Sequence, residues 1–220
     1  MQLRADVAIV GGGVLRLAHA YAAARRGHRV VVFERNPRAA GASARNFGMI
    51  WPIGQPSGEM HTMAMRTPAQ PTGWELGPAL ASGLTLRFYP AFSICTSLAA
   101  LRRRVAAETP EYDRWHIHGL ISQTSQGELT LGDSHEYGTC VDVFNKEEVD
   151  HLILRYISSF LRAPDMSVAQ RWHGVYAKHQ TKPYLRLSPT DGVRIVTGVG
   201  GSGMTLSFGL AEDTISAMSL

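Results

Sequence analysis

The chain has 220 residues, of which 45% are hydrophobic and 18% are charged, and it contains 22 Gly and 11 Pro. This composition is typical of a globular protein with an ordinary hydrophobic core, and it excludes a disordered or collagen-like chain. The formal net charge of +4 suits an anionic small ligand as well as nucleic acid. The sequence lacks the basic patch with interleaved aromatic residues that would favour nucleic acid.

The N-terminal segment has the pattern of a β-α-β unit: a strand, a tight turn, a helix and a second strand. Asp6–Val10 is a short apolar run rich in β-branched residues, and a glycine triplet follows it. Val14–Arg26 continues with an Ala-rich helical composition and stops before Gly27. Val30–Phe33 is a second apolar run without alternation, as expected for a parallel strand covered on both faces.

The glycine triplet and the end of the second strand predict a nucleotide site. Glycines after the first strand let the backbone approach a pyrophosphate, whose charge the free amide groups and the helix N-terminus stabilise. A carboxylate at the end of the second strand can accept hydrogen bonds from both ribose hydroxyls and would repel a 2′-phosphate, so FAD or NAD is favoured over NADP. The candidate cofactor-binding residues of this segment are Gly11, Gly12, Gly13, Val14, Leu15, Glu34 and Arg35.

One residue departs from the dinucleotide fingerprint G-x-G-x-x-G. Arg16 stands where the third glycine would allow the first helix to pack closely on the sheet. A long cationic side chain there must either be expelled or push the helix away, and we expect it to weaken cofactor binding. On the glycine pattern alone, a β-α-β unit that binds no nucleotide is the alternative.

The middle of the chain has the pattern of an α+β lobe. Leu84–Tyr89, Ile117–Gln123 and Glu128–Leu131 alternate like half-buried strands. Ser97–Ala107 predicts a helix with an apolar side and a mainly solvated arginine triplet, and Asn145–Arg162 predicts a longer helix.

The helix predicted over 145–162 carries the clearest start signal. Asn145 stands at the N-cap and Glu148 at the capping-box position. Its apolar face is expected to be core rather than a cofactor site. This face consists of Val149, Leu152, Ile153, Tyr156, Ile157, Phe160 and Leu161.

The C-terminal segment repeats the order of strand, glycine loop and helix. Val193–Thr197 reads as a strand, Gly198–Gly203 as the loop, and Met204–Met218 as an apolar helix. Taken alone, the loop is either a flexible connection or a ligand-binding loop. The polar, glycine-bounded segment Gly41–Met49 is open to the same two interpretations.

Two adjoining stretches, DVAIVGGGVLRLAHAYAAARRGHRVVVFERN and GASARNFGMIWP, carry a family resemblance. They resemble the FAD-binding start of the D-amino-acid-oxidase-like flavoenzymes, which include glycine and sarcosine oxidases, and within that group a branch associated with aminophosphonate breakdown. The resemblance implies that the segment from Ser43 to Met49 runs beside the flavin and that the C-terminal glycine loop returns to the FAD domain. It adds the candidate cofactor contacts Ala42, Ser43, Arg45, Asn46, Gly48, Met49, Gly200, Gly201, Gly203 and Met204.

The resemblance also implies the fold class and the domain organisation. The expected fold is α/β plus α+β, with an incomplete FAD-binding Rossmann-like parallel sheet and an antiparallel-sheet substrate lobe. Residues 1–66 would begin the FAD-binding domain, residues 67–190 would form a partial substrate domain, and residues 191–220 would return to the FAD-binding domain. The strands predicted near both ends of the chain would then share one parallel sheet.

The reaction that the resemblance implies is the oxidation of a small anionic or zwitterionic amine. A hydride would pass from the carbon that bears the amine to the flavin, and molecular oxygen or another acceptor would reoxidise it. Lys178 and Arg186 suit a carboxylate or phosphonate, and His135 and Tyr137 are further candidate substrate contacts, although an exposed turn is the simpler interpretation of His135. No catalytic residue is assigned, and no histidine spacing predicts a metal site.

The resemblance covers two blocks that are not adjacent in the family. Residues 1–66 match its beginning and residues 67–220 its second half, so on the order of 130 residues are absent near Arg66 and Thr67. The segment Thr67–Gly83 reads as a connection rather than a replacement. A sheet shortened in this way would expose apolar surface and an unpaired edge. The alternatives to an active enzyme are therefore an inactive, internally deleted paralogue and, less favoured, an NAD-dependent Rossmann enzyme.

Two further expectations concern the environment of the chain. No apolar stretch is long enough for a membrane helix, and no cleavage site follows the first apolar run, so we expect a cytoplasmic protein without a membrane partner. Cys95 and Cys140 are isolated, and we expect two reduced thiols in or near the core.

Overall fold

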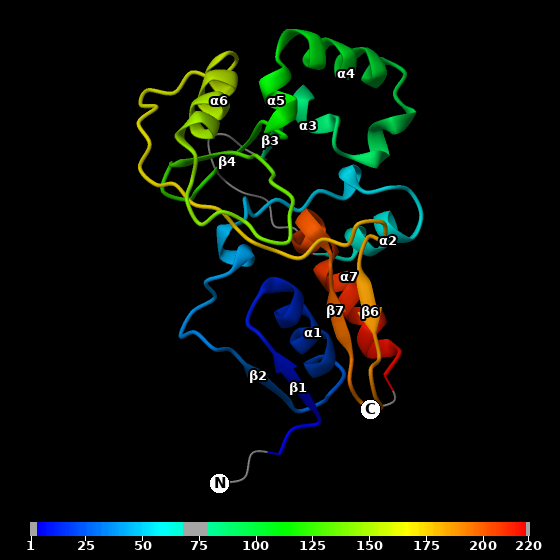
Figure 1. The fold of residues 1–220 in the computed structure, drawn as a ribbon. Coiled ribbons are helices and arrows are strands. Elements are labelled where there is room, and N and C mark those ends of the chain that lie inside the picture. Colours follow the sequence, from blue (N-terminus) through cyan, green and yellow to red (C-terminus); the bar gives the residue numbers. More distant parts are fainter. Residues whose placement is uncertain (1–3, 68–78, 219–220) are drawn as a thin grey trace. The chain divides into compact units, whose positions relative to one another are not determined.

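The computed structural model of the protein describes residues 4–67 and 79–218. The described residues divide into two compact units, one made of residues 4–67 and 174–218 and the other of residues 79–173. The fold is mixed α/β, with a small parallel β-α-β unit and small antiparallel sheets (Figure 1). None of the sheets in the described part of the chain is closed.

The first unit is built from both ends of the chain. Its strands are β1 (Val7–Val10), β2 (Val30–Phe33), β6 (Leu185–Leu187) and β7 (Ile195–Thr197). Its α-helices are α1 (Val14–Ala24), α2 (Glu59–Met65) and α7 (Gly203–Ser216). Three short 3₁₀ helices complete it, namely η1 (Ala42–Arg45), η2 (Pro52–Gly54) and η4 (Gly200–Ser202).

The β-α-β prediction is confirmed. Strands β1 and β2 pair in parallel from Val7 opposite Val30 to Val10 opposite Phe33, and α1 connects them. The helix begins at the predicted residue and ends two residues early, because Gly27, with a φ of +86°, lets the chain leave the helical path toward β2.

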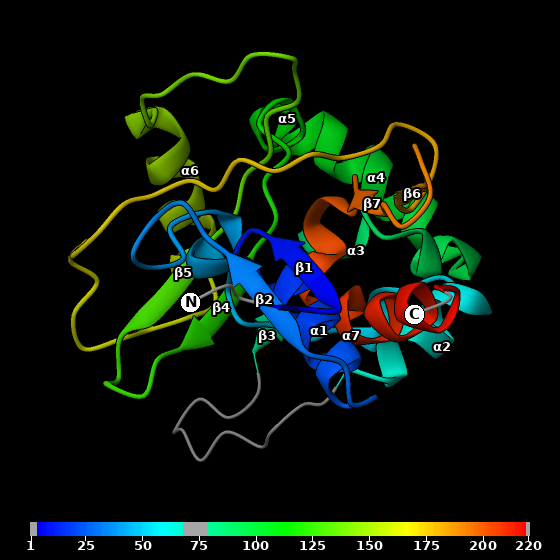
Figure 2. The same ribbon diagram turned by 90° about the horizontal axis from the view of Figure 1, so that it is seen from below.

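Helix α1 lies between the β1–β2 pair and α7, as Figure 2 shows. On α1, Ala18, Ala22 and Ala23 bring the helix close to its neighbours, because alanine side chains keep little distance between two backbones. They contact Val7 of β1 and Ala211 of α7 in one buried cluster. A second cluster joins α1, α2 and α7 through Leu15, Met63, Ala64, Leu206 and Leu210.

The prediction that the strand near residues 193–197 joins β1 and β2 in one parallel sheet is wrong. Strand β7 covers residues 195–197, but it pairs antiparallel with β6, with Arg186 opposite Val196, and does not join β1 and β2. Gly192 has a φ of +74° in the connection between β6 and β7. A short turn of this kind brings a neighbouring strand into antiparallel register at a low entropy cost, whereas parallel pairing needs a long crossover.

The second unit contains one antiparallel sheet and four α-helices. The sheet has the order β3 (Leu80–Ala81), β4 (Leu120–Gln123) and β5 (Leu129–Gly132). The helices are α3 (Gly83–Leu86), α4 (Ser97–Glu108), α5 (Pro110–Arg114) and α6 (Glu147–Ser158), and a 3₁₀ helix, η3 (Pro90–Ile94), precedes α4. The buried core comprises Leu84, Val105, Tyr112, Ile117, Val149 and Leu152.

Two predicted elements of this unit differ in the structure. The strand predicted over 84–89 is instead α3 and the turn after it, because consecutive residues Leu84 and Thr85 are both buried, which a half-buried strand does not allow. Most of the predicted connection 67–83 lies outside the described residues, although Leu80–Ala81 forms β3.

The start of the helix predicted over 145–162 is also wrong. The structure begins α6 at Glu147 after Lys146, without a side-chain cap. The oxygen Oδ1 of Asn145 lies 2.7 Å from Nδ1 of His173, and the carboxylate of Glu148 accepts a hydrogen bond from the Trp115 indole, so both capping groups have other partners. The apolar face is confirmed at Val149, Leu152 and Ile157, whereas Phe160 lies beyond the helix and is exposed.

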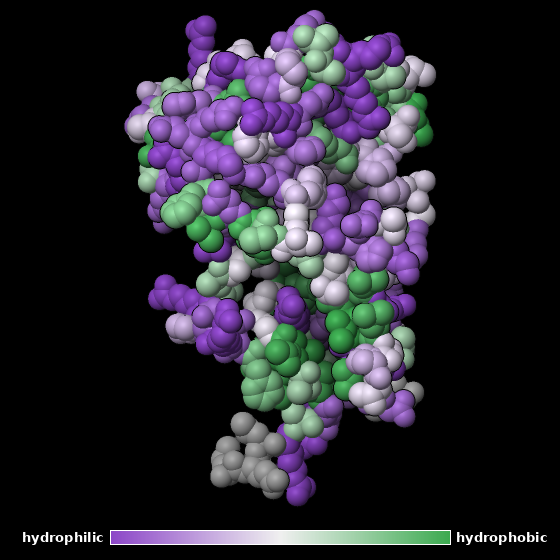
Figure 3. All heavy atoms as spheres, in the orientation of Figure 1, coloured by the Kyte–Doolittle hydropathy of each residue, from purple (hydrophilic) through white to green (hydrophobic). Residues whose placement is uncertain are grey.

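Apolar residues of the β1–β2 pair and of α1 are exposed to solvent. Val10 is 76% and Phe33 is 56% exposed, and Tyr21 of α1 is half exposed. Apolar surface gathers over this region in the lower half of Figure 3. Cys95 and Cys140 are free thiols, as predicted, but their predicted place in or near the core is wrong, because both are exposed on irregular segments. No helix in residues 4–67 or 79–218 is long and apolar enough to cross a membrane.

The close approach of α2 to α7 yields a stability prediction. A side chain at Gly209 would place its Cβ 2.3 Å from the carbonyl oxygen of Met63, so we expect Gly209→Ala to lower the free energy of unfolding by about 1–3 kcal/mol. Helix propensity alone predicts the opposite sign. Urea unfolding measures the change, and Gly83→Ala, where a Cβ meets nothing within 4 Å, is the control. A stabilised Gly209→Ala variant would contradict the close packing.

Candidate functional site

The glycine loop after β1 is locked to the end of β2. Gly11 has a φ of +105°, which favours glycine, and its N–H donates to the carbonyl of Phe33 over 2.6 Å. The N–H of Gly12 donates to Oε2 of Glu34 over 2.6 Å. A Cβ on Gly12 would lie 3.1 Å from that oxygen, so the carboxylate reaches the loop because the loop has no side chain there.

Glu34 is an exposed anion at this position. Hydrogen bonds from the N–H groups of Asn36 and Gly12 lower the pKa of its carboxyl below the ordinary value. The side chain is therefore charged at neutral pH while it keeps contact with solvent. Arg35, the next predicted residue, is exposed and does not line the pocket described below.

Of the two predicted outcomes for Arg16, expulsion of its side chain or displacement of the helix, the structure shows the first. Its side chain is expelled across the glycine loop, where Nε donates to the carbonyl of Val10 over 3.1 Å. A Cβ on Gly11 would lie 2.6 Å from Cδ of Arg16, so the arginine covers that face of the loop. The helix itself still packs on β1 through Ala18 and Val7.

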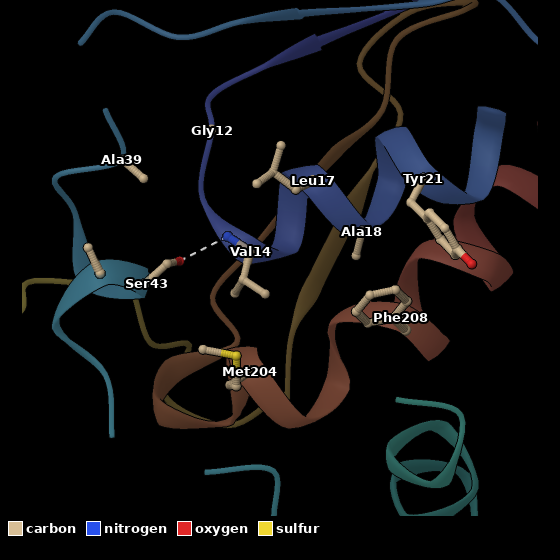
Figure 4. A pocket seen from close by; sticks show the side chains of 10 residues that line it. Gly12, Val14, Leu17, Ala18, Tyr21, Ala39, Ser43, Met204 and Phe208 are labelled. Carbon is tan, nitrogen blue, oxygen red and sulfur yellow. Dashed lines mark hydrogen bonds between the residues drawn. The ribbon is translucent and has the colours of Figure 1, made fainter. Parts of the chain in front are cut away.

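A pocket of about 610 Å³ opens beside this loop, within the first unit. Figure 4 shows that it brings together three segments that are far apart in the sequence: the start of α1, η1 with Ser43, and the start of α7. The hydroxyl of Ser43 accepts a hydrogen bond from the N–H of Val14 over 2.9 Å. The lining residues are Gly12, Val14, Leu17, Ala18, Tyr21, Ala39, Ser43, Ala44, Met204 and Phe208.

Several other predicted cofactor residues lie outside this pocket lining. Leu15 is buried in the cluster between α1, α2 and α7. Oδ1 of Asn46 accepts a hydrogen bond from the N–H of Gly48, whose φ is +70°. The others outside the lining are Gly11, Gly13, Glu34, Ala42, Arg45, Met49, Gly200, Gly201 and Gly203, and a role for any of them in cofactor binding stays a prediction.

The four predicted substrate residues are divided between the two units. Lys178 lies against Gly200, because a Cβ on Gly200 would lie 3.1 Å from Cγ of Lys178. Arg186 is an exposed residue of β6. Both belong to the first unit, whereas His135 and Tyr137 are neighbours in the second, with ring centroids 6.1 Å apart. Their roles in substrate binding stay predictions.

His135 belongs to a cluster in which the participation of His118 was not predicted from the sequence. Its Nδ1 lies 2.9 Å from Nε2 of His118, and its Nε2 lies 3.2 Å from Oδ2 of Asp133. The simple interpretation of an exposed turn is therefore wrong for His135, which is partly buried. His116 and His118 do not share a strand face, because β4 begins only at Leu120 and His116 has a φ of +46°. Alternation suggested a strand here and concealed the turn.

Asp133 carries the strongest electrostatic perturbation in this cluster. Burial raises the pKa of its carboxyl from 3.8 to about 7, against the opposing effect of a backbone hydrogen bond. The side chain of Asp133 as a whole is 27% exposed, whereas its Oδ1 is shielded from solvent. Among residues 4–67 and 79–218, no group of three His, Cys, Asp or Glu side chains has the arrangement of a metal site.

The comparisons with known proteins agree on one family. The chain matches the family model described as "DAO: FAD dependent oxidoreductase" in two stretches, residues 6–115 and 71–217. It is similar to a glycine oxidase of Geobacillus kaustophilus (strain HTA426), with 41% identity over 87 residues, or 40% of this chain. The matched region is 22% of that oxidase, so the chain matches about a fifth of the length of this curated relative. No solved structure matches the chain.

The raised pKa of Asp133 predicts a pH-dependent stability difference. A carboxyl whose pKa is higher in the folded than in the unfolded chain contributes stability that is fully present below pH 3.8 and is lost as the pH rises through about 7. Asn resembles the protonated carboxyl at every pH. The wild type should therefore lose stability between pH 5 and pH 8, and the Asp133→Asn variant should not. We expect the difference in free energy of unfolding, variant minus wild type, to be about 2 kcal/mol larger at pH 8 than at pH 5.

Urea unfolding at a series of pH values measures this difference. Asp191→Asn is the matched control, because Asp191 lies in an exposed turn. A wild-type and an Asp133→Asn protein with parallel pH profiles would show that burial does not hold Asp133 protonated.

Proposed function

Because the chain belongs to the DAO family of FAD-dependent oxidoreductases, we propose that it uses FAD to oxidise the C–N bond of a small amine or amino acid. The observation that carries the proposal is the pocket at the start of α1. There the glycine loop, Ser43 and Met204, which come from three separate predicted cofactor segments, line one cavity. The similarity to a protein named glycine oxidase supports a small amino-acid substrate.

The residues around this pocket fit the nucleotide half of FAD. Gly12 and Gly13 have no side chains of their own, and where their Cβ atoms would be, Oε2 of Glu34 and Oγ of Ser43 lie 3.1 and 3.2 Å away and accept hydrogen bonds from the N–H groups of Gly12 and Val14. Bare backbone at a helix N-terminus is the arrangement that admits a pyrophosphate. The exposed, ionised Glu34 suits a pair of ribose hydroxyls, and Ser43 already accepts the N–H bond that a phosphate oxygen would accept.

The remaining residues would orient the cofactor and shield it. Leu17, Tyr21 and Phe208 give the pocket apolar walls, with Tyr21 and Phe208 in edge-to-face contact at 5.6 Å. Helix α7 begins at Gly203, next to Met204, and the positive end of its dipole favours negative charge near that point. When bound, FAD supplies the acceptor for a hydride from the carbon that bears the amine.

Two of the predicted substrate contacts, Lys178 and Arg186, are cationic and would bind an anionic group of the substrate. Lys178 and Arg186 lie in the same unit as the pocket, and their cationic groups can hold a carboxylate or phosphonate through charge-assisted hydrogen bonds. This assignment supports an anionic or zwitterionic amine, with an aminophosphonate as one member of the class. The oxidant that completes the cycle is molecular oxygen or another electron acceptor.

A second candidate is an inactive paralogue with an internal deletion, which at most binds a dinucleotide. The family model matches the chain in two overlapping stretches rather than one continuous match, and the β1–β2 pair has exposed apolar residues where a wider sheet would cover them. Arg66 and Thr67, at the junction where the deletion would lie, nevertheless form hydrogen bonds with α7. Arg66 forms two hydrogen bonds with Asp213, and Thr67 donates to the carbonyl of Thr205.

Titration with FAD separates the two candidates. We expect the protein to bind FAD with the absorbance changes of a bound flavin, and Glu34→Ala to weaken binding at least about tenfold, because a charged hydrogen-bond acceptor for the ribose is lost. Asp191→Ala removes an exposed carboxylate elsewhere in the same unit and serves as the control. A folded protein that fails to bind FAD would favour the inactive paralogue.

The position of Arg16 yields a separate prediction. Because its side chain lies across the face of the glycine loop, we expect Arg16→Gly to raise FAD affinity by a factor of about ten, as measured by quenching of flavin fluorescence. Arg16→Gln retains much of the bulk without the charge and is expected to bind like the wild type. A loss of affinity in both variants would mean that the guanidinium attracts the pyrophosphate rather than obstructing it.

A further inference from the structure

A second cavity lies in the other unit, where the proposed cofactor site contributes no residue. It has a volume of about 430 Å³ and lies among α3, α4 and α5. Its lining residues are Arg87, Phe88, Arg102, Arg103, Ala106 and Asp113. Two of them belong to the arginine triplet of α4, which sequence reasoning treated as mainly solvated.

Arg87 forms the fixed, buried side of this cavity. Its side chain is only 3% exposed, and its Nη1 pairs with Oδ1 of Asp113. Its Nε and Nη2 donate to the carbonyl oxygens of Leu84 and Ile117 over 3.1 and 3.3 Å. The guanidinium also lies over the ring of Phe88, with 4.8 Å from Cζ to the ring centroid. A buried guanidinium held by this many contacts has one orientation, so it is preorganised before any ligand arrives.

Arg102 and Arg103 add positive charge that the described part of the chain does not neutralise. Nη2 of Arg102 donates to the carbonyl of Arg87 over 2.8 Å, which fixes the side chain but leaves other N–H donors of the guanidinium for a ligand. Neither Arg102 nor Arg103 has an ion-pair partner among the described residues. Arg104, the third member of the triplet, is outside the cavity and pairs with Glu108 at 3.8 Å.

The charges of the lining residues define the ligand. Three guanidinium groups against the one carboxylate of Asp113 leave two positive charges around the cavity. Guanidinium groups bind phosphate-like oxyanions through paired N–H donors, and two charges match a dianion better than a single carboxylate. Phe88 and Ala106 provide an apolar surface for a small organic substituent.

We propose that this cavity binds a tetrahedral dianion, a phosphate or phosphonate group, carried by a small molecule. Arg102 and Arg103 make the direct contacts and carry the two net positive charges, and Arg87, which is paired with Asp113, orients Arg102 through its backbone carbonyl. The proposal is independent of FAD binding and of oxidation, because every residue that it uses lies in the second unit.

The test is isothermal titration of the full-length protein with inorganic phosphate and with methylphosphonate at constant ionic strength. We expect saturable binding with one site per chain, and at least a tenfold weaker affinity in Arg102→Ala and in Arg103→Ala, because each variant loses a charge-assisted contact. Whichever probe binds more tightly identifies whether the site favours a free phosphate or a group with a carbon substituent.

Arg104→Ala is the matched control, since it removes the same charge from the same helix outside the cavity. We expect it to bind both probes like the wild type, and nitrate not to compete. Arg103→Gln, which keeps the length of the side chain, replaces Arg103→Ala if the alanine variant unfolds. Equal loss of affinity in the Arg103 and Arg104 variants, competition by nitrate, or the absence of saturation would overturn the proposal, because each indicates only diffuse surface charge.

Discussion

The packing of α1 against α7 is the interaction on which the first unit depends. The two helices come from opposite ends of the chain, and small residues at their interface allow a close approach: Ala18 and Ala22 on one side, Ala211 on the other. This contact holds the start of α7 beside the start of α1. Without it, the glycine loop and Met204 could not line the same pocket.

The parts of the fold that could be predicted from sequence are those governed by local patterns. A β-branched run, a glycine triplet and an alanine-rich helix specify the β-α-β unit almost without tertiary information. The pairing of β7 could not be predicted, because a three-residue strand has the same pattern in parallel and antiparallel sheets. The same limit explains α3. Thr85 is buried because its hydroxyl accepts a hydrogen bond from the N–H of Gly119, a contact that no local pattern encodes.

Some residues of the candidate site could be predicted from local sequence patterns, and others only from the family resemblance. The spacing of the loop and the second strand predicted Glu34 as a ribose contact, but its hydrogen bond from the N–H of Gly12 is seen only in the structure. Ser43 and Met204 were included only because of the family resemblance. In the cluster around Asp133, His135 was predicted from the sequence, whereas its contact with His118 was not, because turns rather than a strand bring the two rings together. The two cavities are also chemically distinct: one has apolar walls beside a bare backbone loop, and the other is rich in guanidinium groups.

The two-stranded parallel pair has a consequence for the behaviour of the protein in concentrated solution. Among the described strands, β1 and β2 pair only with each other, so each has an outer edge of backbone donors and acceptors next to exposed side chains such as Val10 and Phe33. Such an edge is a template for β pairing between molecules. Pairing at such an edge needs no prior unfolding, because the edge is already formed in the native fold.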